Sequence, residues 1–293
     1  MMRDYAIFTD STCDLTDEMY RAAGLEVFRM SLFIGNDEYI DDGKTLAGHD
    51  FYQKMREGAM PTTVQYSMES YINTFEAVLK SGRDVIYLCF ASACSGQYQT
   101  VQSIAREIGE KYPDGKIYVI DSQSECGGEG RLALAMAEKK AAGMDIDALY
   151  AWTMENRQFF IHYFTVDDLG HLYRGGRLSK ASAIAGTMLG IKPVMYTATD
   201  GKLTVGSKVR GRKASLKMLC DRMFENAVEP EKQDMIINHA DCPEDAEWMR
   251  SYIEAHVHPK SITVLPLGPI IGSHVGPGCI ALFFTGRTRL WHA

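Results

Sequence analysis

Short apolar runs alternate with longer amphipathic segments through the first half of the chain. The runs at 5–8, 85–90 and 116–120 are bounded by polar or small residues, a pattern typical of parallel strands that are covered on both faces. After the second run, apolar residues between positions 101 and 108 recur at helical spacing, with polar residues between them. Strands and helices that alternate in this way predict a mostly parallel sheet with helices on its faces.

Hydroxyl side chains stand where several predicted helices begin. Thr16 and Ser67 are expected to cap helices, and Ser95 is expected to cap the helix that follows the second apolar run. The stretch from 25 to 34 predicts one strand, which would make the first unit β-α-β. Residues 36–60 are polar and contain several glycines, so we expect an excursion or lid there.

The pattern changes in the second half of the chain. Residues 159–166 are aromatic and β-branched, as in strands, and the segments 191–197 and 202–205 flank Asp200-Gly201, a good hairpin signal. A hairpin combined with helices is typical of an α+β arrangement.

The length of 293 residues favours two domains over one. We therefore expect an N-terminal α/β/α domain with a mostly parallel sheet over residues 1–157. A C-terminal α+β domain is expected over residues 158–293.

Composition narrows the class of protein. A net charge of −7 argues against nucleic acid as a partner, and no run approaches the roughly 18 apolar residues of a membrane span. The seven cysteines are scattered without a CxxC pair, so neither a metal site nor a disulfide framework is expected. The start of the chain also lacks the apolar core of a signal peptide. These features predict a cytoplasmic protein without stable membrane insertion.

Asp10 and Asp14 follow the first apolar run and allow two interpretations. They could form a metal pair or supply a phosphatase nucleophile, but polar residues at a strand end more commonly tie the turn to the next helix. The glycines at 127–130 do not match a dinucleotide fingerprint, and we expect them to allow close packing of a helix near 131–142.

Candidate ligand-binding groups lie on predicted loops. A helix N-terminus at Ser95, beyond the carboxyl end of a parallel strand, suits an anion because free N–H groups and the helix dipole point there. Thr62 and Thr63 could face the same crevice or only cap a turn. His274 lies in the segment 268–278, which is rich in glycine and proline, and we expect a long loop that directs the imidazole at a ligand.

Several motifs in order make the chain similar to the DegV family, the bacterial fatty-acid-binding proteins. The segments that carry the resemblance are 8–15, 63–67, 95–98, 169–178, 191–193, 209–212 and 272–278. Among them are Ser95-Gly96-Gln97-Tyr98, where the family has Ser-Gly-Thr-Tyr, and a Gly-Ser-His-Val-Gly-Pro-Gly run where it has Gly-Thr-His-Thr-Gly-Pro-Gly.

The resemblance implies two domains with a long-chain fatty acid buried between them and no other cofactor. Carried over by position, Thr63, Ser95 and His274 would bind the carboxylate, with help from the N–H group of Gly96. Arg177 and Ser92 would serve this site or support its loop.

The resemblance also implies a partner. Some family members present the bound acid to an ATP-dependent fatty acid kinase, which makes acyl phosphate for phospholipid synthesis. Residues 208–213 carry four positive charges, which is either a solvated face or a docking patch, and Arg210 and Arg212 match the basic segment implicated in that docking.

The chain departs from the family pattern at three positions near the expected site. Val64 stands at a serine, Tyr66 at a proline and Gln97 at a threonine. An alternative function is a hydrolase or acyltransferase with Ser95 as nucleophile and His274 as base. Against it, Ser95 lacks the flanking glycines of a nucleophile elbow.

Overall fold

The computed structural model describes residues 3–46, 48–179 and 190–291, and the described strands form three sheets. The first sheet contains β1 (Tyr5–Asp10), β2 (Leu25–Phe28), β6 (Asp84–Cys89) and β7 (Ile117–Asp121), in the order β2-β1-β6-β7. All neighbouring strands in it are parallel. β1 and β6 are buried at every position, which explains their largely apolar runs and confirms the predicted parallel sheet.

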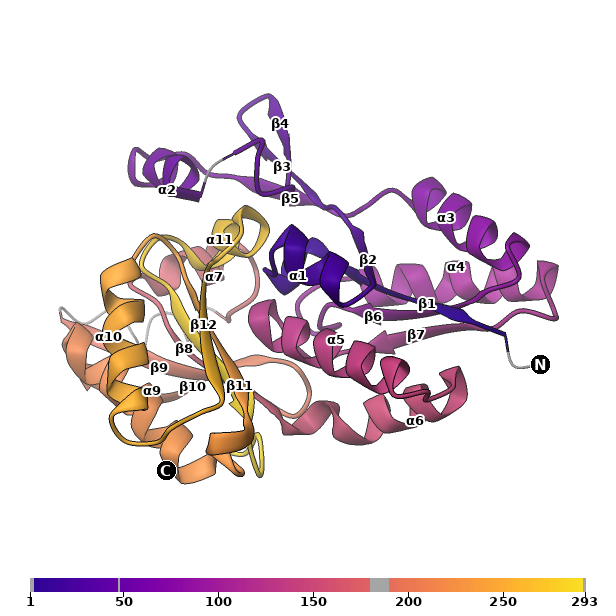
Figure 1. Ribbon diagram of the computed structural model, residues 1–293. Helices are drawn as coiled ribbons and strands as arrows, with labels where there is room; N and C mark the ends of the chain where they lie inside the picture. The colour runs from indigo at the N-terminus through magenta and orange to yellow at the C-terminus, as the bar shows by residue number, and fades with distance from the viewer. Residues whose placement is uncertain (1–2, 47, 180–189, 292–293) are drawn as a thin grey trace.

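Helices cover both faces of the parallel sheet. α3 (Met68–Lys80) and α4 (Gln97–Lys111) lie on one face, and α5 (Cys126–Ala141) and α6 (Ile146–Asn156) lie on the other (Figure 1). Two of the predicted caps are confirmed. The side chain of Thr16 caps the N-terminus of α1 (Asp17–Ala22), and that of Ser67 caps the N-terminus of α3, each by accepting a backbone N–H.

A second large sheet contains the strands of the second half of the chain. Its members are β8 (Phe160–Thr165), β9 (Ile191–Thr197), β10 (Leu203–Arg210), β11 (Asp234–His239), β12 (Ser261–Pro266) and β13 (Ile280–Thr285), in the order β10-β9-β8-β13-β11-β12. β11 and β12 pair in parallel, and the other neighbours are antiparallel. β9 and β10 form the predicted hairpin, with Gly201 at positive φ. α9 (Arg212–Asn226) and α10 (Pro243–Glu254) lie on the outer face (Figure 1).

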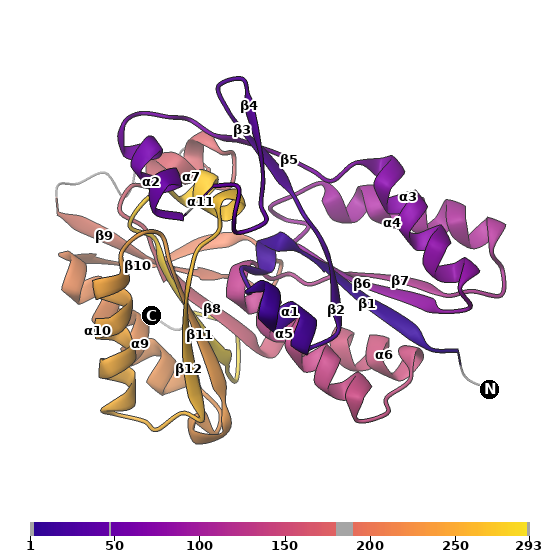
Figure 2. The same cartoon turned by 45° about the horizontal axis from the view of Figure 1, so that its top comes forward.

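The small third sheet corrects one prediction. The stretch from 25 to 34 is two strands, because β3 (Ser31–Ile34) leaves the parallel sheet and pairs antiparallel with β4 (Asp37–Ile40) and β5 (Thr62–Val64). The backbone N–H of Met30 donates to the Ser11 hydroxyl instead of to a strand, and the chain changes direction there. The expected excursion over 36–60 therefore contains β4 and α2 (Gly48–Arg56). α2 contacts α11 (Pro269–Val275), which in turn packs against α7 (Leu169–Arg174) (Figure 2).

α5 packs between the two large sheets. It contacts β1 on one side and β8, β11 and β13 on the other. It begins at Cys126, earlier than predicted, so the glycines at 127–130 lie inside its first turns. A Cβ on Gly128 would lie 2.2 Å from Nε2 of His162, which only glycine avoids. The expected close packing of helix on strand is thus confirmed.

The fold is mixed α/β, with a parallel-sheet core and a second sheet domain. The chain passes from one large sheet to the other through α5, α6 and the short helix η2 (Arg157–Phe159). Two other short helices are η1 (Ser11–Cys13) and η3 (Pro230–Lys232). The exact division at residue 157 stays a prediction. α11, from the second half of the chain, contacts α2, β3 and β5 from the first, so the two halves share a surface around α11.

Candidate functional site

A cavity of about 420 Å³ is lined by residues from both large sheets. This volume lies in the range of roughly 300–1,000 Å³ that is usual for small-molecule sites. Most of the wall is apolar. The large apolar side chains in it belong to Met30, Phe90, Phe164, Leu172, Leu203, Leu267, Ile270, Ile271, Val275 and Phe283, and Ala281 lies among them. The wall is therefore suited to hold a long apolar group.

The loop between β6 and α4 supplies polar groups at one part of the wall. It lies at the carboxyl end of a parallel strand, where ligands of α/β sheets bind. Ser92 donates through both its backbone N–H and its hydroxyl to the Asp121 carboxylate, at 3.0 and 2.6 Å, so it supports the loop. Arg177 donates from Nε to the Cys94 carbonyl at 2.9 Å, and it also lines the cavity.

Ser95 is not the cap of α4, contrary to the prediction. The helix begins at Gln97, its N-cap is Gly96, and no side chain caps it. The Ser95 hydroxyl instead accepts the N–H of Gln97 at 3.2 Å, because the turn places it one residue before the cap. Ser95 and Gly96 both line the cavity at this helix N-terminus.

Thr63 and His274 meet across the cavity wall. The Thr63 hydroxyl lies 3.0 Å from Nε2 of His274, although 211 positions separate them in the chain. Neighbouring threonines alternate across β5, so Thr63 lines the cavity whereas Thr62 is exposed. The sequence left both possibilities open for this pair, and the structure assigns the cavity to Thr63.

The segment 268–278 corrects a second prediction, because most of it is helical. α11 begins after Gly268 with Pro269 in its first turn and ends at Gly276, which has positive φ. His274 lies in its last turn. The backbone N–H of Gly268 donates to the Asp14 carboxylate at 2.9 Å, so Asp14 positions the helix that carries the histidine.

Asp10 also has a structural role. It accepts the N–H of Thr12 at 3.1 Å, as expected for a polar residue that ties the strand end to the next turn. Its other oxygen accepts from the Tyr87 hydroxyl and the Gln97 amide, each at 3.1 Å. Gln97 thus anchors the first turn of α4. Tyr66 packs its ring 4.9 Å from that of Phe28.

Burial governs the electrostatics at His274. Burial, with a smaller effect from the Arg177 cation, lowers the pKa of His274 to about 4. The ring is therefore neutral at pH 7. Nδ1 is buried without a hydrogen-bond partner in the described structure. A neutral imidazole beside a guanidinium is an environment that favours an incoming anion.

The structure brings most of the predicted site residues together. Thr63, Ser92, Ser95, Gly96, Arg177 and His274 all line the one cavity. Arg210 and Arg212 lie elsewhere, at the end of β10 and the start of α9. Arg210 is exposed, whereas Arg212 pairs with Asp245 at 2.7 Å and with Asp167 at 3.7 Å.

The sequence analysis missed a second polar group of cavity residues, Glu125, His162 and Thr197. One signal was present: His162 interrupts the apolar strand 160–165 on the same face as Phe160 and Phe164, and a buried polar residue in such a run needs a partner. Glu125 follows a strand end, where the pattern suggested only a turn.

The described ranges contain neither a candidate metal cluster nor a candidate membrane span. No group of three or more His, Cys, Asp or Glu side chains there could hold a metal ion. No helix among the described residues is long and apolar enough to cross a membrane.

The fold and the site together define a class, the two-sheet α/β proteins that enclose an apolar cavity with hydroxyl and imidazole groups on its wall. The family model described as "Uncharacterised protein, DegV family COG1307" matches residues 4–287. A DegV domain-containing protein of Clostridium perfringens is 40% identical over 98% of this chain and 99% of its own length. This chain therefore belongs to the DegV family.

Solved structures agree with that assignment. A fatty-acid-binding DegV family protein of Thermus thermophilus superposes with a TM-score of 0.87 at 27% identity, covering 98% of this chain and 100% of the other. A fatty-acid-binding DegV family protein of Streptococcus agalactiae gives a TM-score of 0.86 at 27% identity, with the same coverage.

Proposed function

We propose that this protein binds a long-chain fatty acid in the cavity between its two large sheets. The observation that carries the proposal is the apolar wall that meets Thr63, Ser95 and His274 at one region. Relatives with the same fold are fatty-acid-binding proteins. In this proposal the carboxylate enters between Thr63 and His274 and replaces their mutual hydrogen bond, so that the Thr63 hydroxyl and Nε2–H of His274 both donate to it. The carboxylate also accepts from Ser95 and from the N–H of Gly96, while Arg177 and Ser92 hold the loop.

The physical chemistry of a fatty acid fits such a cavity. Each buried methylene contributes about 0.8 kcal/mol, so a long acyl chain supplies on the order of 10 kcal/mol before ordering costs. A buried carboxylate is costly alone but is stable when it accepts several hydrogen bonds. Arg177 adds positive charge beside that position, which further favours an anion.

A carrier fits the geometry better than the alternative hydrolase or acyltransferase. A catalytic base needs hydrogen bonds to the nucleophile and to a third, orienting group. Among the described residues, Nε2 of His274 is bonded to Thr63 rather than to Ser95, and Nδ1 has no partner. The pair that such an enzyme would need is therefore not preassembled.

The carboxylate region is also the part of the cavity best placed for presentation to another protein. Thr63, Arg177 and His274 line a second hollow of about 360 Å³ as well as the main cavity. A fatty acid kinase could approach the carboxylate from that side to form acyl phosphate for phospholipid synthesis. The cytoplasm is the compartment we propose, and all seven cysteines are unpaired, as a reducing environment would keep them.

Native mass spectrometry of the purified protein, followed by denaturation and lipid identification, tests the binding function. We expect a stoichiometric long-chain fatty acid that is released on denaturation. A protein that is purified without lipid and stays empty after addition of fatty acid would contradict the proposal. Hydrolysis of an acyl ester that is lost in Ser95→Ala would favour the alternative.

Docking of a kinase is tested separately. Arg210 and Lys213 are exposed, so Arg210→Ala and Lys213→Ala remove charge without breaking the ion pairs of Arg212. With a fatty acid kinase as partner, we expect this double variant to lose phosphorylation of the bound acid but to retain the lipid. Unchanged phosphorylation would exclude this patch as the docking surface.

A further inference from the structure

A groove at the boundary between the two halves of the chain shares no lining residue with the main cavity. Its volume is about 460 Å³, within the range of roughly 300–1,000 Å³ that is usual for small-molecule sites. α1 and α5 line it from one side, and β11 and β12 line it from the other. We call it the α5 groove, because α5 contributes one whole face to it.

The face of α5 in the groove is long and mostly apolar. It consists of Arg131, Leu134, Ala137, Glu138 and Ala141, which follow helical spacing. Between the first and the last of them the helix rises about 15 Å. The residues that α1 and β11 place opposite are also mainly apolar. The groove is therefore an elongated apolar surface with a cation, Arg131, at one end of its α5 face.

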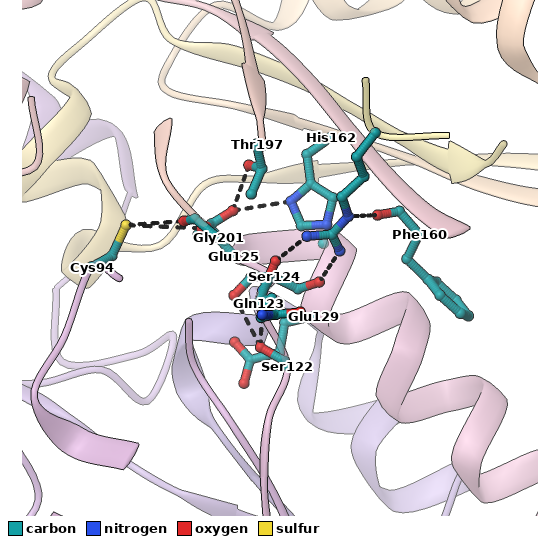
Figure 3. A network of polar contacts seen from close by, with 12 residues as sticks. Cys94, Ser122, Gln123, Ser124, Glu125, Glu129, Phe160, His162, Thr197 and Gly201 are labelled. Carbon is teal, nitrogen blue, oxygen red and sulfur yellow. Dashed lines mark hydrogen bonds and ion pairs between the residues drawn. The ribbon is translucent and has the colours of Figure 1, made fainter. Parts of the chain in front are cut away.

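Arg131 differs from the other arginines that the fold covers. It is half-buried, yet no hydrogen bond or ion pair engages its guanidinium in the described part of the chain. Every other half-buried or buried arginine of the described ranges has such a partner. Arg289, which is 2% exposed, donates to the Ser124 hydroxyl and the Phe160 carbonyl (Figure 3) and to two further carbonyls.

The carboxylates near Arg131 do not complete it. One oxygen of Asp234 accepts from Lys260 at 2.7 Å, and the other accepts from the Ser261 hydroxyl at 2.6 Å. Glu138 is exposed at the opening of the groove. Burial lowers the pKa of Arg131, and the negative charges of Asp234 and Glu138 oppose that shift. The guanidinium therefore stays protonated at pH 7 with its donors unused.

A ligand has access to these donors. No nitrogen of Arg131 has a partner, and none is among the buried unpaired atoms of the described structure, so each of them is open to solvent. The planar guanidinium matches a carboxylate through two parallel hydrogen bonds. Asp234 and Glu138 would repel a doubly charged phosphate more strongly than a singly charged carboxylate.

The apolar length of the groove sets the rest of the ligand. At a C–C bond length of about 1.5 Å, an extended chain of roughly twelve carbons spans the distance that α5 covers here. An unbranched hydrocarbon chain can thus follow the helix from Arg131 to Ala141. Ala22, Glu138 and Ala141 are exposed, so the chain would stay in partial contact with water.

We propose that the α5 groove binds a second long-chain carboxylate, separate from the one in the main cavity. Its carboxylate pairs with Arg131, and its hydrocarbon chain lies along the apolar face of α5. Because the groove is open on one side, this site is weaker than the main cavity and exchanges its ligand faster. The inference does not depend on the proposed function, since the two sites have no residue in common.

The test adds dodecanoic acid to the full protein after its main cavity has been filled with octadecanoic acid. Native mass spectrometry should show a complex of the protein with one molecule of each acid. In Arg131→Gln the affinity for dodecanoic acid should fall about tenfold or more, because the charged hydrogen-bond donor is lost. Dodecan-1-ol has the same chain without the charge and should not form the complex.

Two further variants act as controls. Arg21→Gln removes an exposed arginine of α1 that does not line the groove, and it should leave the affinity unaltered. Glu138→Gln removes a negative charge near Arg131 and should strengthen the binding of dodecanoic acid a fewfold. This substitution is on the surface, so it keeps the inference testable if Arg131→Gln does not fold.

The outcomes separate this inference from the proposed function. A protein that holds octadecanoic acid but forms no complex with both acids would overturn the inference and leave the proposed function standing. Equal affinity for dodecanoic acid in the wild type and in Arg131→Gln would also overturn it. A protein that takes up no octadecanoic acid but binds dodecanoic acid through Arg131 would refute the proposed function alone.

Discussion

Two histidines line the same cavity with different hydrogen-bond partners. His274 lies at the end of α11, with the Thr63 hydroxyl at Nε2 and the Arg177 cation nearby. His162 lies in the middle of β8, with the Glu125 carboxylate at Nδ1. Burial lowers the pKa of both rings, so both are neutral at pH 7. The neighbours, rather than the rings, distinguish the two places.

This difference determines which ligand group each region can accept. A carboxylate near His274 is stabilised by Arg177 and by hydroxyl donors. Beside His162 the corresponding place is already taken by the Glu125 carboxylate, which faces Nδ1 of His162 and accepts from the Thr197 hydroxyl. Each ring also packs on a glycine: a Cβ on Gly175 would lie 2.6 Å from Nδ1 of His274, and one on Gly128 would lie 2.2 Å from Nε2 of His162. The two histidines thus mark two chemically different regions of a single cavity.

The largest expected effect on binding comes from His274→Ala. Loss of a hydrogen bond to a charged group costs about 1.5–3 kcal/mol, so the affinity for octadecanoic acid should fall roughly 10- to 150-fold. Displacement of a fluorescent fatty acid measures this change, with His258→Ala as the control. An affinity within about twofold of the wild type would show that the carboxylate does not lie at His274.

The variant Gly128→Ala should lower the free energy of unfolding by an amount similar to the binding free energy that His274→Ala loses. In Gly128→Ala the added Cβ would collide with the His162 ring, and overpacking of this kind costs about 1–3 kcal/mol. Gly109→Ala is the matched control, because Gly109 is also helical and its Cβ would have no neighbour within 4 Å. Urea unfolding should show that Gly109→Ala is as stable as the wild type or more so. Equal stability of both variants would mean that the ring moves aside at no cost.

Two adjacent threonines give a smaller effect with an internal control. Thr63→Val keeps the shape of the side chain but removes the hydroxyl that faces His274, so fatty-acid affinity should fall about tenfold. Thr62→Val makes the same change on the exposed face of β5 and should leave the affinity unaltered. Isothermal titration calorimetry of both variants with fatty acid measures the two affinities. Equal losses would assign the effect to the strand rather than to the hydroxyl.

The smallest expected effect is the pH dependence of fatty-acid binding. The pKa of His274 is about 4 without ligand, and a bound carboxylate should raise it. The complex then holds more protons than the free protein, so affinity should rise a fewfold as the pH falls from about 7 to about 5.5. Titrations at several pH values in His274→Gln should lack this rise. A slope that the glutamine variant retains would come from another group.

Local signals in the sequence predicted the elements that depend on nearby residues. The caps at Thr16 and Ser67 and the turn at Gly201 were predicted correctly, because each depends on contacts within a few positions. The buried parallel strands were predicted correctly because burial on both faces gives each of them a largely apolar run. The errors arose where a distant contact overrides the local pattern. The strand expected over 25–34 breaks at Met30, whose N–H binds Ser11, and α11 starts where Gly268 binds Asp14.

The motifs by themselves determined the family and supplied Thr63, Ser95, Gly96 and His274 as candidates. Only the tertiary structure showed that Thr63 rather than Thr62 meets His274, since that contact joins the third sheet to a helix 211 positions away. It alone also brought Glu125, His162 and Thr197 together, from a loop and two strands. Spacing along a chain reports which face a side chain occupies, but packing between faces decides which side chains meet.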